Sequence, residues 1–225
     1  MKHIALKSLA FAACALGFSA LPASAGVIVY TFDQDGCSGS GCGLTNYGTV
    51  TLTDISGGVN VKVSLLNGSG LIDTGAMSGH SLTFNLAGAP SVTFTNLPSL
   101  WTTTGPANWS PNGGWGTFNY ILDCNTACGS NNPWTTGLDF DVAGTGTGIT
   151  TASFIDSGTA KDTYFLADIS NPNGGTPLTG RIGASYSGTG TTTQVPEPFT
   201  MSLFGAGLAG MATLRRRRKL RAAVA

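Results

Sequence analysis

The stretch Val59-Asn60-Val61-Lys62-Val63-Ser64-Leu65 alternates apolar and polar residues without interruption. Successive side chains of a β-strand point to opposite faces, so this alternation predicts a strand with one buried face and one solvated face. Residues 26–184 contain no segment with a convincing 3.6-residue repeat of apolar positions, which is the pattern of an amphipathic helix. The sequence therefore predicts an all-β domain.

Similar alternation recurs along the chain, separated by Gly-, Ser-, Thr- and Asn-rich segments that favour tight turns. The expected strands lie at residues 27–32, 50–52, 59–65, 82–86, 92–94, 118–122, 138–142, 154–155, 164–169 and 182–186. Short strands with such connections are typical of an antiparallel β-sandwich of jelly-roll type, which we expect for residues 26–184. The Gly-, Ser- and Thr-rich residues 185–194 are predicted to form a flexible linker.

The N-terminal segment has the pattern of a secretory signal peptide. Two lysines are followed by an apolar run at residues 9–21 and by the small residues Ala23-Ser24-Ala25. This arrangement predicts that signal peptidase removes residues 1–25 and leaves Gly26 as the new N-terminus. An uncleaved membrane anchor is the alternative, but the apolar run is short for a stable span.

The C-terminal segment combines a short motif, an apolar run and a basic cluster. The motif is Val195-Pro196-Glu197-Pro198, the uncharged run covers residues 199–214, and Arg215-Arg216-Arg217-Arg218-Lys219 begins a basic tail at 215–221. As a helix, the run would be roughly 24 Å long, and local thinning of the bilayer would let it span. Because Lys and Arg stay on the cytoplasmic side, we expect one transmembrane helix and a domain that faces the periplasm. The alternative is a buried core helix followed by a solvated charge run.

These C-terminal parts, in this order and spacing, resemble the PEP-CTERM sorting domain, also catalogued as the ice-binding-protein C-terminal domain. The resemblance covers about residues 194–221. It implies that an exosortase, a membrane cysteine transpeptidase-like enzyme, recognises the precursor in the inner membrane and cleaves it near the Pro-Glu-Pro motif. It also implies a Gram-negative-type bacterium that makes an exopolysaccharide, and a mature protein at the cell surface or outside the cell.

The net neutrality of the chain conceals an acidic middle. Between the two signals only Lys62, Lys161 and Arg181 carry positive charge, against ten aspartates. This excess of about seven negative charges argues against nucleic acid or anionic lipid as a partner.

Four cysteines remain after export, in the close pairs Cys37/Cys42 and Cys124/Cys128. An even number in an oxidising compartment favours two disulfides, and of the three connectivities we expect the local one. A zinc site is the alternative, but neither pair has the two-residue spacing of common zinc sites. The segment Asp33-Gln34-Asp35-Gly36 resembles the start of a calcium loop without its later ligands, so a polar turn is favoured. We expect no metal or cofactor.

The tryptophans are candidates for carbohydrate contact. Trp101, Trp109 and Trp115 fall in a long connection at residues 97–115, and Trp134 lies in another Gly- and Asn-rich segment. Long loops are often functional, and an exposed aromatic ring can stack on the apolar face of a sugar. The alternative is that the loop folds back and the rings cover one end of the core.

One catalytic pattern competes with a binding role. Asp73-Thr74-Gly75 and Asp156-Ser157-Gly158 each follow two apolar residues and are similar to the active-site loop of aspartic proteases, where two aspartates share a proton. The body is too short for two pepsin-like lobes, and the intervening sequence shows no convincing repeat. We therefore expect an exported structural or carbohydrate-binding protein and no enzyme, with an aspartic-protease-like secreted hydrolase as the alternative.

Overall fold

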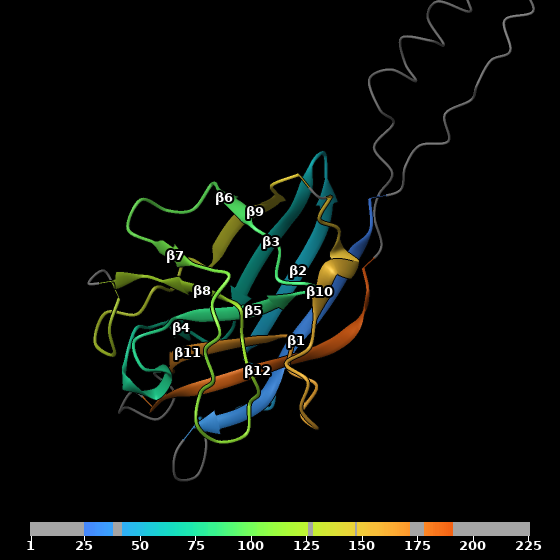
Figure 1. Cartoon of the computed structure of the whole chain (residues 1–225). Helices are drawn as coiled ribbons and strands as arrows, with labels where there is room; N and C mark the ends of the chain where they lie inside the picture. Colours follow the sequence, from blue (N-terminus) through green and yellow to red (C-terminus); the bar gives the residue numbers. More distant parts are fainter. Residues whose placement is uncertain (1–24, 38–41, 126–127, 147, 172–177, 191–225) are drawn as a thin grey trace, which may run out of the picture. The chain divides into compact units, whose positions relative to one another are not determined.

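The computed structural model describes residues 25–37, 42–125, 128–146, 148–171 and 178–190 (Figure 1). Within them the chain forms strands and two short 3₁₀ turns, η1 (Gly75–Met77) and η3 (Thr151–Ser153), and no α-helix. None of the helical segments in these ranges is long or apolar enough to cross a membrane. The strands are β1 (Val27–Cys37), β2 (Gly48–Ile55), β3 (Gly58–Leu65), β4 (Gly70–Leu71), β5 (Leu82–Leu86), β6 (Val92–Thr95), β7 (Thr102–Thr104), β8 (Tyr120–Asp123), β9 (Leu138–Gly144), β10 (Phe154–Ile155), β11 (Phe165–Asn171) and β12 (Leu178–Thr189).

Strand β3 confirms the alternation from which the fold was predicted. Its apolar residues Val59, Val61 and Val63 are buried, whereas the Lys62 side chain between them is exposed. Ile55 pairs with Gly58, so β2 and β3 form a hairpin with a two-residue turn at 56–57. Gly57 adopts a φ of 86°, a left-handed conformation that costs glycine little.

All the strands pair antiparallel, as predicted, but they do not form two separate sheets. They belong to one sheet with the order β6-β9-β3-β2-β1-β12-β11-β5-β8-β7, with β4 and β10 paired to β11 and β5. The jelly-roll expectation is therefore corrected to a single sheet that curls over its own core. Strand alternation specifies which residues face the core, but it does not specify where the sheet bends.

The curl brings the two ends of the sheet into contact through aromatic side chains. The buried Phe84 of β5 stacks on Tyr120 of β8 at 5.4 Å between ring centroids. The same ring lies 6.3 Å from Phe94 of β6 and 6.5 Å from Phe140 of β9, at the other end of the strand order. Phe84 therefore lies at the centre of a core that closes an almost cylindrical sheet.

Strand β12 extends further than the sequence suggested. It pairs with β1 from Cys37↔Gly180 to Ile28↔Thr189, and the backbone N–H of Gly190 donates to the Val27 carbonyl at 3.0 Å. Residues 185–189, expected in the linker, are thus strand. Serines, threonines and glycines do not by themselves indicate a strand, and here the strand forms because it pairs with β1, which is distant in sequence.

The long connection at 97–115 folds back over the sheet and contains the three-residue strand β7 (Figure 1). Its continuation is fastened to β5 by Asn85, whose side-chain amide donates to the Thr117 carbonyl at 2.7 Å and accepts from the Asn119 N–H at 2.8 Å. Trp115 and Phe118 pack with Leu166 of β11 in a second hydrophobic cluster. The buried Asn85 of β5 therefore finds its hydrogen-bond partners in this loop.

Both local disulfides are confirmed. Cys37–Cys42 and Cys124–Cys128 have Cα–Cα distances of 5.4 and 5.8 Å. The Asp35 carboxylate accepts hydrogen bonds from the N–H groups of Cys37 (2.8 Å) and Cys42 (2.9 Å). It also accepts from the Tyr47 hydroxyl at 2.5 Å, and burial together with this bond raises the pKa of Tyr47 to about 12.

Residues 1–24 of the signal peptide predicted at 1–25, the sorting segment at 195–221 and the linker residues 191–194 lie outside the described residues.

We predict that Phe84→Ala lowers the free energy of unfolding by about 3–5 kcal/mol, because it removes the ring on which both ends of the sheet close. Urea unfolding followed by tryptophan fluorescence measures the loss. The exposed Leu100 provides the control, since Leu100→Ala should change stability by less than about 0.5 kcal/mol. A similar small effect for Phe84→Ala would contradict the closed arrangement.

Candidate functional site

The candidate site is built on the segment 72–81, which connects β4 to β5 and contains η1. Strand β11 holds this segment at both ends through one residue, Asp168. The Ile72 N–H donates to the Asp168 carbonyl at 2.9 Å, and the Asp168 N–H donates to the Ser81 carbonyl at 3.0 Å. The first half of the segment carries Asp73, and its last turn carries His80.

The Asp168 side chain adds a third attachment. Its Oδ2 atom accepts from the Thr74 hydroxyl at 2.6 Å and from the Thr74 N–H at 3.2 Å, while Oδ1 has no hydrogen-bond partner within the described part of the chain. The residue is fully buried, and this burial raises the pKa of its carboxyl to about 6, although Thr74 and the neighbouring Arg181 lower it. Asp168 therefore positions the loop at an electrostatic cost.

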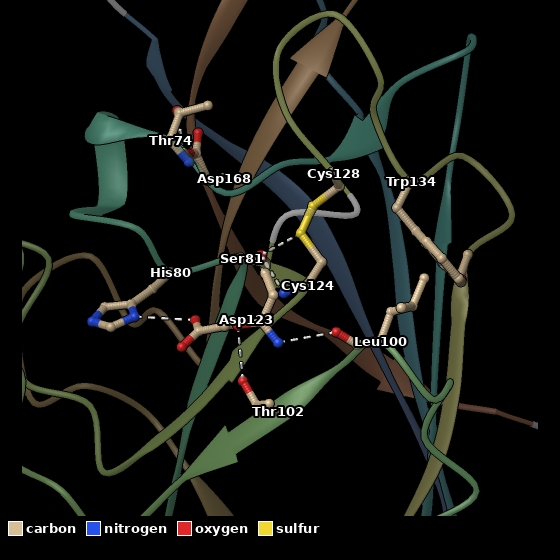
Figure 2. The surroundings of a disulfide bond; sticks show 12 residues. Thr74, His80, Ser81, Leu100, Thr102, Asp123, Cys124, Cys128, Trp134 and Asp168 are labelled. Atoms are coloured by element: carbon tan, nitrogen blue, oxygen red, sulfur yellow. Dashed lines mark hydrogen bonds and ion pairs between the residues drawn. A yellow bond between two sulfur atoms is a disulfide. The ribbon is translucent and has the colours of Figure 1, made fainter.

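His80, Asp123 and Trp109 form the accessible part of the site. His80 Nδ1 lies 3.1 Å from Asp123 Oδ1, and the two side chains are 22% and 17% exposed, so an external ligand can reach them (Figure 2). The half-buried Trp109 ring meets the His80 ring edge-on, with centroids 4.9 Å apart. Burial and the nearby Asp123 raise the pKa of Asp73, whereas His80 lowers it.

The second disulfide holds Asp123 in place. Ser81 Oγ lies 3.0 Å from Cys124 Sγ and accepts from the Cys124 N–H at 3.2 Å, so the start of β5 is joined to the end of β8 (Figure 2). The next residue, Asn125, donates its side-chain N–H to the Leu100 carbonyl, just before β7, at 3.1 Å. A short cross-linked loop thus fixes the carboxylate beside His80.

The four predicted tryptophans do not form one exposed platform. Trp101 and Trp115 are only 6% and 3% exposed, so their rings cover the core, as the alternative interpretation expected. Lys161 Nζ also lies 3.6 Å above the Trp115 ring. Trp134 is partly buried, packs edge-on against Trp101 and donates its indole N–H to the Gly137 carbonyl at 2.6 Å. Trp109 is therefore the tryptophan best placed for a ligand.

The two protease-like motifs lie in different surroundings. Asp73 is influenced by Asp123 and His80, whereas Asp156 Oδ1 accepts from the Gly158 N–H at 2.5 Å in a tight turn. Among the described residues, no hydrogen bond joins the Asp73 and Asp156 carboxylates. An aspartic-protease mechanism requires two aspartates that share a proton, whereas these two carboxylates have different neighbours.

A metal-like cluster of Asp35, Cys37 and Cys42 has another explanation. The two sulfurs are joined in a disulfide and do not act as thiolate ligands. Both Asp35 oxygens accept hydrogen bonds within the same loop. The geometry favours the polar turn over a calcium loop.

The sequence did not point to His80, Asp123 or Asp168 as site residues. His80 lies just before the expected strand at 82–86, and the two aspartates occur in strands without a recognisable motif. The sequence offered one signal, because aspartate is rare inside an otherwise apolar strand such as residues 165–169.

We predict that Asp168 makes stability depend on pH. Its folded-state pKa of about 6 lies above the unfolded value of about 3.9, so the folded protein binds the proton more tightly. The contribution of Asp168 to the free energy of unfolding should be highest below about pH 4 and should fall by roughly 3 kcal/mol as the pH rises through 6. Urea unfolding of Asp168→Asn between pH 4 and 7 should lack this fall.

The exposed Asp162 provides a control of equal charge change, and Asp162→Asn should keep the native pH profile. Parallel profiles for Asp168→Asn and the native protein would show that Asp168 does not titrate as stated.

Comparison with known proteins identifies the C-terminal segment. A family model described as the PEP-CTERM protein-sorting motif matches residues 194–218, which include Val195–Pro198 and the four consecutive arginines. No curated protein and no solved structure matches the chain. The match confirms the predicted sorting motif, and with it an exported protein that exosortase processes from a membrane-anchored precursor. The chain therefore carries a PEP-CTERM sorting signal on the C-terminal side of its β-domain.

Proposed function

We propose that this exported protein is a non-catalytic surface or matrix component whose β-domain binds exopolysaccharide at Trp109, His80, Asp123 and Asp73. The observation that carries the proposal is the Trp109 ring beside an accessible His80–Asp123 pair. Exosortase-sorted export brings this surface to the compartment where exopolysaccharide is found.

The chemistry of the pair suits a sugar. The face of an indole ring packs on the axial C–H groups of a pyranose, while carboxylate and imidazole atoms exchange hydrogen bonds with its hydroxyls. His80, Asp123 and Asp73 lie on two segments fixed by Asp168 and by the Cys124–Cys128 disulfide. Such fixed groups lose little conformational freedom on binding, which favours affinity.

Charge narrows the class of polysaccharide. The domain carries ten aspartates against three basic side chains, and Asp73 and Asp123 lie in the site itself. A polyanionic chain rich in uronic acids would be repelled. The ligand is therefore a neutral polysaccharide or one that carries amino sugars.

The two targeting segments complete the proposal. Signal peptidase removes residues 1–25, the run at 199–214 holds the precursor in the inner membrane with the domain in the periplasm, and exosortase cleaves near Pro196-Glu197-Pro198. The mature protein then reaches the cell surface or the extracellular matrix.

We predict that Trp109→Ala weakens binding to neutral or amino-sugar polysaccharide at least about tenfold, because the stacking surface is lost. Trp109→Phe should retain part of the affinity. Glycan-array binding followed by calorimetry on the strongest ligand measures both effects. The matched control is Tyr186→Ala, which removes another exposed aromatic ring.

Equal affinities for Trp109→Ala and the native protein would place the binding surface elsewhere. Absence of binding to every neutral and amino-sugar glycan, and to the host's own polysaccharide, would contradict the binding role.

We predict that Glu197→Gln with Pro196→Ala leaves the precursor in the inner membrane, because the sorting motif is lost while the apolar run remains. Cell fractionation with mass spectrometry of the C-terminus reports the outcome. Thr193→Ala, next to the matched segment, should be processed normally. Release of the double variant at the native rate would show that sorting does not depend on this motif.

A further inference from the structure

The first residue of the domain is held by a carboxylate. The Gly26 N–H donates to Asp54 Oδ2 at 3.1 Å, and the Gly26 carbonyl accepts from the Asp54 N–H at 2.9 Å. The second of these bonds extends the backbone pairing of β1 with β2 by one residue beyond Val27, and the first adds a side-chain acceptor. Gly26 is also the residue that the predicted signal-peptidase cut would leave at the N-terminus.

A third segment of the chain orients the Asp54 carboxylate through hydrogen bonds. Its Oδ1 atom accepts from the Thr151 N–H at 2.6 Å, and Oδ2 lies 3.4 Å from the Thr151 hydroxyl at the start of η3. Across the described ranges, no Lys or Arg side chain forms an ion pair with Asp54. The carboxylate is thus oriented by hydrogen bonds but has no cation beside it.

A side chain at position 26 would require the Asp54 carboxylate to move from its present place. A Cβ atom on Gly26 would overlap Asp54 Oδ2 and would lie 3.1 Å from the Thr151 hydroxyl oxygen. A chain cut one residue earlier or later would bring an alanine or Val27 to its terminus, and neither terminal nitrogen would lie at Asp54. The geometry is therefore specific for a terminus at residue 26.

We propose that Asp54 is the receptor for the N-terminus that signal-peptide removal creates. Hydrolysis of the Ala25–Gly26 peptide bond consumes one water and leaves a carboxylate on Ala25 and an ammonium on Gly26. The neutral N–H donor seen in the uncut chain becomes a cationic donor at the same Asp54 oxygen. Charge-assisted hydrogen bonds are about twice as strong as neutral ones.

The bond acts at a strand that much of the sheet depends on. Strand β1 pairs with β2 on one side and with β12 on the other, and Gly190 of the C-terminal end bonds to Val27. Removal of the signal peptide therefore strengthens the bond that holds the first strand in register. The inference rests on the export step of the proposed function and is independent of the polysaccharide site.

The test uses the full chain, expressed with its own leader, exported and purified after processing. Mass spectrometry should find Gly26 at the N-terminus. Native protein and Asp54→Asn are then each compared before and after acetylation of the α-amine, which restores an uncharged amide at the position of the Ala25 carbonyl. Lys62 and Lys161 are acetylated in both proteins alike.

Acetylation should lower the folding equilibrium constant of the native protein about tenfold, and that of Asp54→Asn by less than about twofold. The α-amine of folded native protein should also be acetylated several-fold more slowly than that of Asp54→Asn. Equal effects of acetylation on both proteins would overturn the inference. An exported protein with a different N-terminus would overturn it too, whereas a protein that is not exported would overturn the proposed function.

Discussion

The pairing of β1 with β12 is the constraint on which the rest of the structure depends. These strands are the first and the last of the domain, and their register runs from Cys37↔Gly180 to Ile28↔Thr189. The pairing joins the β2–β3–β9–β6 half of the sheet to the β11–β5–β8–β7 half, so that a single sheet can close around Phe84. It also places Val27 and Gly190 next to each other.

The site depends on this frame because Asp73, His80 and Trp109 lie on connections between strands, and Asp123 lies at the end of β8. Strand β11 pairs with β12 and presents the Asp168 backbone and carboxylate to the segment 72–81. Burial of that carboxylate costs free energy, as its raised pKa indicates. In return, its hydrogen bonds hold the segment that carries Asp73 and His80. The Cys124–Cys128 disulfide fixes Asp123 at the end of β8. Rigid scaffolds that support such loops are typical of binding sites.

The sequence predicted what depends on local pattern. The alternation at 59–65 identified β3, and the four- and five-residue cysteine separations identified both disulfides. It did not predict the long-range features. The curl of the sheet depends on contacts between Phe84 and Phe94 or Phe140, and β12 continues through polar residues because β1 supplies its hydrogen bonds. His80 and Asp123 are 43 residues apart and meet only because β5 pairs with β8.

In the proposed function, an exported β-domain presents Trp109 and the His80–Asp123 pair to a neutral or amino-sugar polysaccharide. Hydrogen–deuterium exchange of the processed protein, with and without polysaccharide purified from the producing bacterium, tests it most directly. We predict slower exchange in residues 72–81, 107–118 and 120–125, with the β2–β3 hairpin unchanged. Protection confined to other surfaces, or none at saturating polysaccharide, would contradict it.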